Sequence, residues 1–194
     1  MRSYFLCQNC ELIFVPRNQL IPEIKEKERY ELHQNAESDP YYQDYLSQIL
    51  ISVLPLIEKN QVGLDFGCGR TTLLAQLFSQ KGIEVDSFDY YFLKDETIWN
   101  KKYDFIVLSE VIEHLRDPFE EMKSLKNILN PNGKMFIKTK FYPQKSEFDQ
   151  WFYKRDLTHI QFFNPQSMEH LGHSLQMKSE FYLNGPDLTL FRKL

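Results

Sequence analysis

The sequence predicts an α/β fold in which a mostly parallel sheet lies between two layers of helices. Short apolar stretches typical of buried strands recur through residues 60–194, and segments with helical periodicity separate several of them. A glycine turn, Gly67-Cys68-Gly69, joins the first such strand to a helix. We expect a three-layer α/β sandwich with a sheet of the seven-stranded type that ends in an antiparallel hairpin, preceded by an extension over residues 1–59.

The composition favours one well-packed domain that acts on small molecules. Of the 194 residues 42% are hydrophobic, enough for a single core. The formal net charge of -4 gives no overall basic field, so a nucleic-acid partner is less expected than a small molecule but stays open. The N-terminus lacks the apolar run of a signal peptide, and no stretch approaches the roughly 20 apolar residues of a membrane span. We expect a cytoplasmic protein without a membrane partner and, with three cysteines, without a disulfide framework.

The glycine turn has the pattern of a nucleotide-type cofactor site. Alternating apolar residues from Val62 to Phe66 predict a buried strand, and residues 71–80 continue with helical spacing. Gly67 and Gly69 lie between the two, where residues without side chains let the backbone come close to a ligand. A cofactor is therefore expected beside this turn.

Two carboxylates favour S-adenosylmethionine (SAM) over a dinucleotide. A dinucleotide site has a third glycine where this chain has Thr72. Asp65, two residues before the first glycine, would repel a pyrophosphate but suits the ammonium and sulfonium charges of SAM. Asp89 follows the next predicted strand, residues 83–88, at the spacing at which an acidic side chain accepts hydrogen bonds from both ribose hydroxyls.

With these residues the chain resembles the class I SAM-dependent methyltransferases, whose first motif is an acidic residue followed by Gly-x-Gly. The resemblance covers roughly residues 60–194 and implies a Rossmann-like fold that binds SAM. A Rossmann-like turn without a ligand is the alternative. The cofactor-binding residues that we expect are Asp65, Gly67, Cys68, Gly69, Asp89, Tyr90 and Ser109.

The N-terminal extension begins with Cys7-x-x-Cys10 between two short apolar stretches, which predicts a hairpin. The hairpin resembles the last knuckle of the zinc-binding segment that precedes some methyltransferases. A structural zinc needs about four protein ligands, and His33 and Cys68 are the nearby candidates for the others. The alternative is a hairpin with two reduced thiols.

Two helices are expected before the glycine turn. The first is a charge-rich stretch from Glu23, and the second covers residues 41–59, where Asp39-Pro40 supplies a start signal. We expect the second helix to cover one edge of the core and the mouth of the cofactor site. The pattern Tyr30-x-x-His33-x-Asn35 resembles a signature of a bacterial subgroup of these methyltransferases, although capping and helix packing would also explain it.

The segment after Asp89 is shorter than in most members of the family. Residues 90–102 separate the second predicted strand from the strand at 103–108. The third strand of the sheet is therefore either very short, near Ile98 and Trp99, or replaced by a loop. For this reason the sequence does not identify the residues that contact the adenine.

A second group of candidate site residues, two glutamates and a histidine, follows the strand at 103–108. If a helical turn forms there, Glu110, Glu113 and His114 lie on one face and form a plausible divalent-metal site. His159 can return to the same rim as a fourth ligand, or act alone as a general base. The pattern resembles the metal site of small-RNA 2'-O-methyltransferases and of ubiquinone-pathway O-methyltransferases. Many methyltransferases without a metal also carry it, with the glutamate as a helix cap.

Residues 141–163 are rich in aromatic and basic side chains and are the expected substrate lid. The aromatics could contact an acceptor or form the lid's own core. A helix from Pro165 and two strands, at 178–183 and 187–193, complete the chain. The expected function is methyl transfer from SAM to an oxygen of a small molecule, with His159 and His114 as catalytic candidates. An RNA methyltransferase and a non-catalytic SAM-binding module are the alternatives.

Overall fold

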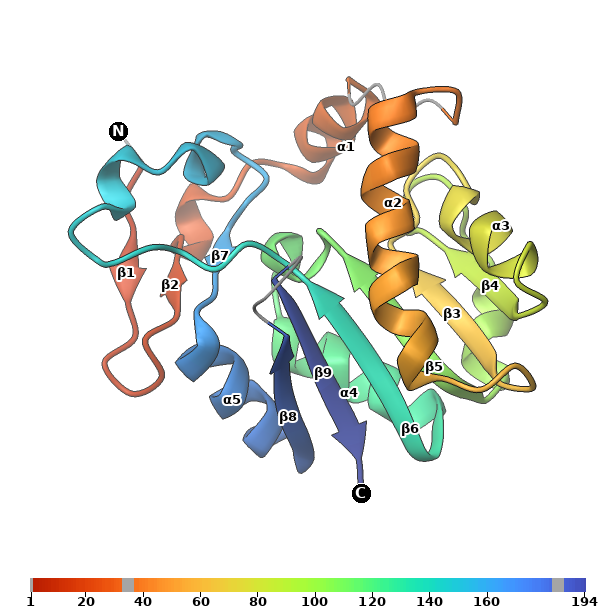
Figure 1. Ribbon diagram of the computed structural model, residues 1–194. Helices are drawn as coiled ribbons and strands as arrows, with labels where there is room; N and C mark the ends of the chain where they lie inside the picture. Colours follow the sequence, from red (N-terminus) through yellow and green to blue (C-terminus); the bar gives the residue numbers. More distant parts are fainter. Residues whose placement is uncertain (1, 33–36, 183–186) are drawn as a thin grey trace.

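The computed structural model describes residues 2–32, 37–182 and 187–194. Its centre is a six-stranded sheet in the order β4-β3-β5-β6-β9-β8 (Figure 1). The first four strands are parallel, and the last two form the predicted antiparallel hairpin. The strands are β3 (Val62–Phe66), β4 (Glu84–Phe88), β5 (Tyr103–Ser109), β6 (Leu129–Lys138), β8 (Met177–Tyr182) and β9 (Leu188–Lys193).

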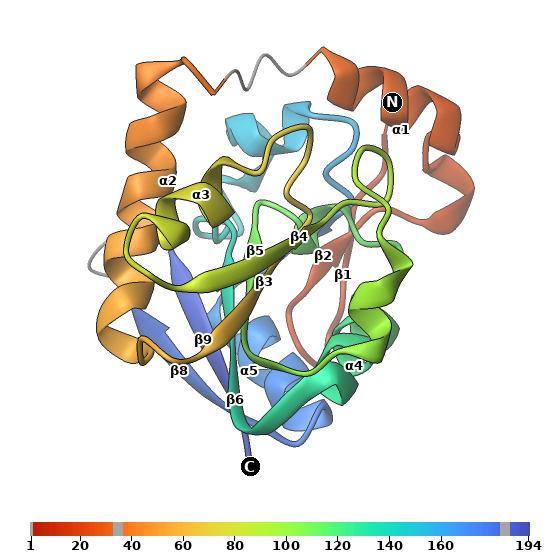
Figure 2. The ribbon, with the colours of Figure 1, turned by 90° about the vertical axis from the view of Figure 1, so that its right-hand side faces the viewer.

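Helices cover both faces of the sheet, which confirms the three-layer prediction (Figure 2). Strand β5 shows why. Its side chains alternate, so Phe105 and Val107 pack with α2 and α3, whereas Ile106 and Leu108 pack with α4 and α5. The helices are α2 (Pro40–Val53), α3 (Leu73–Ser79), α4 (Pro118–Ile128) and α5 (Pro165–Ser174).

The sheet is one strand short of the seven-stranded type. Between β4 and β5 the chain forms the short 3-10 helix η3 (Glu96–Asn100), and the Asp95 side chain caps it by accepting from the Thr97 amide. Ile98 is buried in the core, and Trp99 packs against Phe66 and Phe88. Residues 90–102 thus fill the place of the third strand with a helical turn and aromatic packing.

The N-terminal hairpin and the lid form one unit. Strands β1 (Phe5–Leu6) and β2 (Ile13–Phe14) pair with β7 (Gln161–Phe162) in a second, three-stranded sheet. A separate apolar cluster joins this sheet to the lid helices η5 (Phe148–Gln150) and η6 (Phe152–Arg155). The lid aromatics in this cluster therefore form the lid's own core. Its buried members are Ile13, Val15, Tyr142, Phe148, Tyr153, Ile160 and Phe162.

The remaining elements connect these parts. Helix η1 (Arg17–Gln19) and helix α1 (Glu23–Glu31) follow β2, and η2 (Leu54–Leu56) follows α2. Asp39 accepts a hydrogen bond from the amide of Tyr41 at the start of α2, which confirms the predicted start signal. The predicted roles of His33 and Asn35, and the turn at 184–186, lie outside the described residues. Within the described residues, no helix is long and apolar enough to cross a membrane. The cytoplasmic location stays a prediction.

Gly67 connects the fold to the site, and its replacement tests that connection. Gly67 has φ 82, and a methyl group at its α-carbon would overlap the Val111 side chain. We expect Gly67→Ala to lower the free energy of unfolding by about 2–4 kcal/mol, because backbone strain and overpacking add. Gly82→Ala is the matched control, since Gly82 has φ 76 with open space around it. Urea denaturation measures both, and equal losses would contradict the proposed overlap with Val111.

Candidate active site

A cavity of about 1050 Å³ opens where β3, β4 and β5 end. Open parallel sheets bind ligands at this edge, beyond the carboxyl ends of their strands. All seven predicted cofactor-binding residues line the cavity, as do Glu110, His114 and His159. Glu113 is fully buried and lies behind the lining. The structure thus brings the two predicted groups together around one space.

The glycine turn forms one wall of the cavity. Gly69 has φ 69, and a Cβ atom built on it would meet nothing within 4 Å, so its backbone faces open space. Asp89 holds this turn to the loop after β4. One of its oxygens accepts a hydrogen bond from the Gly69 amide at 3.0 Å, and the other accepts from the amides of Tyr91 and Phe92 at 2.8 and 3.1 Å. Its contact with a ribose stays a prediction.

Asp65 is a buried carboxylate that faces the cavity. It is 4% exposed and lines the cavity. Burial, and then the nearby charge of Asp89, raise the pKa of Asp65 to about 7. A buried carboxylate near a second carboxylate is costly, and a cationic ligand would reduce the cost. The ammonium and sulfonium groups of SAM fit this environment.

Tyr90 closes the cavity on the side of the missing strand. Its ring packs edge-on against Phe66 and Phe88, and its hydroxyl donates to Glu121 at 2.8 Å. The next two residues, Tyr91 and Phe92, also line the cavity. These three residues give this side of the cavity an aromatic lining, the kind of surface on which a purine can stack.

Glu113, His114 and His159 form a compact group at the other end of the cavity. One possible ligand atom from each lies within 4.8 Å of the other two. His114 comes from the short helix η4 (Ile112–His114), and its Nδ1 donates to the carbonyl of Thr158 at 3.0 Å. His159 Nδ1 donates to the carbonyl of Tyr153 at 2.7 Å. Because carbonyls only accept, both imidazoles carry their proton on Nδ1 and keep a free lone pair on Nε2.

The carboxylate of Glu113 completes the group. Its Oε1 contacts the Tyr153 hydroxyl, whose one proton is shared between this oxygen and Glu110, whereas its Oε2 is buried with no hydrogen-bond partner among the described residues. Burial, and then the nearby charge of Glu110, raise the pKa of Glu113 to about 7. Burial lowers the pKa of both His114 and His159, so both are neutral at pH 7.

Glu110 lies next to Glu113 but does not belong to the group of three possible metal ligands. Its φ of 53 is left-handed, so it does not continue the helical turn that the spacing predicted. Its carboxylate accepts instead from the buried Lys138 ammonium at 3.0 Å and from the Tyr153 hydroxyl at 2.6 Å. Burial alone would raise the pKa of Glu110, but Lys138 and Tyr153 lower it below its ordinary value. Glu110 is therefore an ionised carboxylate on the cavity wall.

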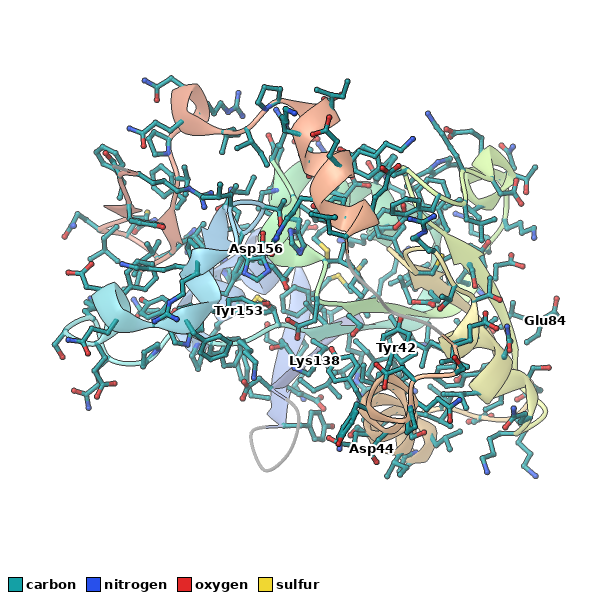
Figure 3. The ribbon with its side chains drawn as sticks, turned by 90° about the horizontal axis from the view of Figure 1, so that it is seen from above. Tyr42, Asp44, Glu84, Lys138, Tyr153 and Asp156 are labelled. Atoms are coloured by element: carbon teal, nitrogen blue, oxygen red, sulfur yellow. The ribbon has the colours of Figure 1, made fainter. Side chains whose placement is uncertain are left out.

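Three residues of the site were not predicted. Lys138 is a charged residue at the end of an apolar strand, a signal that could have identified it. Tyr45 bonds to the Ser109 hydroxyl at 2.9 Å, and its position has no signal in the sequence. Tyr153 contacts both glutamates; it lies in the predicted aromatic lid, but its contact with the glutamates was not predicted. Figure 3 shows Tyr153 on the lid side of the molecule and Tyr42, which also lines the cavity, on the side of α2.

The N-terminal segment fixes the lid above the site. Arg2 donates to the carbonyls of Asp156 and His159 at 3.2 and 2.8 Å, and Arg29 pairs with the Asp156 carboxylate at 3.2 Å. The Tyr30 ring of α1 packs edge-on against His114. Residues 2–32 therefore contribute to the active site although the sequence predicted them as a separate extension.

Comparisons with known proteins agree with this geometry. The family described as "Methyltransferase domain" matches residues 38–178. The solved 1,6-didemethyltoxoflavin-N1-methyltransferase of Burkholderia thailandensis, bound to its substrate and S-adenosylhomocysteine, is 13% identical with a TM-score of 0.61. The match covers 99% of this chain and 98% of that one. An O-methyltransferase family protein from the same organism is 14% identical with a TM-score of 0.59, covering 86% of this chain and 61% of that one.

A curated relative shares part of the sequence. The tRNA U34 carboxymethyltransferase of Campylobacter fetus is 36% identical over 61 residues, which are 31% of this chain and 22% of that protein. The chain thus matches less than a quarter of that relative's length. The family match covers most of the chain, and the two solved structures share its fold. The chain therefore belongs to the methyltransferase domain family.

Proposed function

We propose that this methyltransferase transfers the methyl group of SAM to a hydroxyl oxygen of a small molecule. The observation that supports this proposal is the pair of neutral histidines at the end of the cavity, each with a free Nε2 lone pair. In the proposed arrangement Asp65 and the glycine turn hold the methionine end of SAM, Asp89 the ribose and Tyr90 the adenine. The acceptor then lies between Ser109 and His159.

The histidines favour oxygen over nitrogen as the acceptor atom. A neutral amine has a lone pair ready to attack, whereas a hydroxyl is a weak nucleophile until its proton leaves. In the proposed step without a metal, the oxygen attacks the methyl carbon as the carbon–sulfur bond breaks, and His159 Nε2 takes the hydroxyl proton; a metal held by His159 would use the same lone pair and is the alternative to this step. The sulfonium is already a good leaving group, so the protein supplies mainly alignment and this proton acceptor.

A divalent metal fits Glu113, His114 and His159. Imidazole nitrogens and carboxylate oxygens are common ligands of divalent metals. Here each imidazole is oriented by a hydrogen bond from its Nδ1 to a carbonyl, as metal-binding histidines usually are, and one oxygen of Glu113 has no partner among the described residues. A bound metal would polarise the acceptor hydroxyl and lower its pKa. We infer that these three residues would hold it, and that Glu110, paired with Lys138, would not.

The charge of the cavity supports a small acceptor over RNA. Among the described residues that line it, carboxylates outnumber cationic side chains threefold, which disfavours a phosphate backbone. The partial match to a tRNA carboxymethyltransferase keeps RNA as the second candidate. RNA binding that weakens steeply with salt would favour it. The cavity carboxylates are Glu23, Glu26, Asp65, Asp89, Glu110, Asp117, Glu120, Glu121 and Asp156, and the cations are Arg70, Lys94 and Arg116.

SAM binding should depend on the ionisation of Asp65. Because its pKa is raised to about 7 without a ligand, Asp65 must lose a proton to bind a cation. We expect SAM affinity to rise by about tenfold or more between pH 5.5 and 7.5. Asp65→Asn should weaken binding, remove this pH dependence and, at pH 8, stabilise the ligand-free protein by about 1–2 kcal/mol. Calorimetry and thermal unfolding measure these effects, and an unchanged SAM affinity would rule out the proposed contact.

Replacing His159 should separate chemistry from cofactor binding. We expect His159→Ala to lower the rate of S-adenosylhomocysteine formation about 100-fold to 10,000-fold with a hydroxyl acceptor, because the proton acceptor is lost. SAM affinity should stay within about twofold, since the glycine turn is untouched. His170→Ala, on the exposed face of α5, is the control. A panel of hydroxyl and amine acceptors provides the assay, and full activity of the His159 variant would disprove its role.

The two glutamates give a matched test of the metal proposal. Glu113→Gln should weaken binding of Mn²⁺ or Zn²⁺ at least about tenfold, because it replaces a ligand oxygen with an amide. Glu110→Gln removes the same charge from a residue outside the group, so metal affinity should change by about threefold or less. Equilibrium dialysis of both variants measures this difference. Equal losses would place the metal elsewhere.

A further inference from the structure

The hairpin turn between β1 and β2 presents two thiols side by side. Cys7 and Cys10 are both free and partly exposed. They are separated by two residues in one turn, the Cys-x-x-Cys spacing that can bind a metal through both sulfurs.

The backbone of the turn is fixed independently of a metal. The Cys7 amide donates to the Leu12 carbonyl at 2.8 Å, and the Glu11 amide donates back to the Cys7 carbonyl at 3.0 Å. Glu11 has φ 61, so the chain accepts a left-handed residue to close the turn. The Glu11 carboxylate is unavailable as a ligand because Lys145 and Asn164 occupy it. The two sulfurs therefore remain as the metal donors of this turn.

One chain supplies only half of a zinc site. Structural zinc takes four ligands, often as two Cys-x-x-Cys pairs. Cys68, the other cysteine, lines the cofactor cavity in the glycine turn. In the described part of the chain the one group of three or more metal donors is Glu113, His114 and His159, so no further donor joins Cys7 and Cys10. The missing pair must come from outside the described residues.

We propose that zinc binds between two copies of this chain, with Cys7 and Cys10 of each copy completing a four-thiolate site. A two-fold axis through the metal would relate the two hairpins, since identical surfaces meet in such dimers. The turn projects from the edge of the molecule beside β1 and β2, so a second hairpin can approach it (Figure 1). Phe5, 52% exposed and stacked on Phe14, supplies apolar surface next to the turn for the same contact.

The reduced full-length protein tests this proposal directly. Zinc or Co²⁺ is titrated into it, and the molar mass is followed by light scattering. We expect saturation of the sulfur site at one metal per two chains, a doubling of the mass, and thiolate-to-cobalt absorption bands. Chelation should reverse all three. A monomer with a sulfur-bound metal, or no sulfur-bound metal at all, would overturn the proposal.

Three variants distinguish the sulfur site from the metal group of the active site and from a site within one chain. Cys10→Ser should abolish the thiolate bands and the dimer, whereas Gln8→Ser, at an exposed position between the two cysteines, should leave both. Glu113→Gln should also leave both, because that residue belongs to the proposed metal group in the active site. The proposed sulfur site and the proposed metal group of the active site can thus be disproved independently of each other. Loss of the thiolate bands in a further variant, His33→Ala, would show that a single chain completes the site, and would disprove the dimer.

Discussion

The close approach of the glycine turn to the segment after β5 determines the layout of the active site. Gly67 has no side chain, so Val111 packs directly against its α-carbon. This contact brings the turn that follows β3 next to Glu110 and the short helix η4. The cofactor residues and the histidines consequently share one cavity instead of two separate clefts. A larger residue at position 67 would move the two halves apart, so the proposed places of the methyl donor and of the proton acceptor depend on the same small space.

Local patterns predicted most of the sheet, and non-local contacts account for what they missed. Alternation from Val62 to Phe66 and the cap at Asp39 act within a few residues, so the sequence is sufficient to find them. The pairing of β2 with β7 involves two-residue strands from opposite ends of the chain, which no local pattern could identify. The sequence also did not reveal the partners of Glu110. Its left-handed backbone conformation, which spacing cannot reveal, accompanies an ion pair with Lys138, while Glu110 still shares the Tyr153 hydroxyl with Glu113.

The cavity keeps two buried carboxylates in unfavourable surroundings. Asp65 is buried close to the charge of Asp89, and Oε2 of Glu113 is buried without a hydrogen-bond partner among the described residues. Groups of this kind cost stability, whereas the nearby carboxylates of Glu110 and Asp89 are fully engaged. Asp65 and Glu113 therefore mark two places, one at each end of the cavity, where a bound ligand would remove a cost in stability.

The pairing of β2 with β7 in the lid sheet also bears on the order of folding. Strand β2 lies near the start of the chain, yet its partner β7 directly follows His159. Contacts between such distant segments form late, because closing a long loop costs chain entropy. During synthesis the hairpin must wait until almost the whole chain has left the ribosome. Thus a chain that ends before β7 contains the parallel strands β3 to β6 but lacks both the lid sheet that positions His159, the proposed proton acceptor, and the hairpin of β8 and β9.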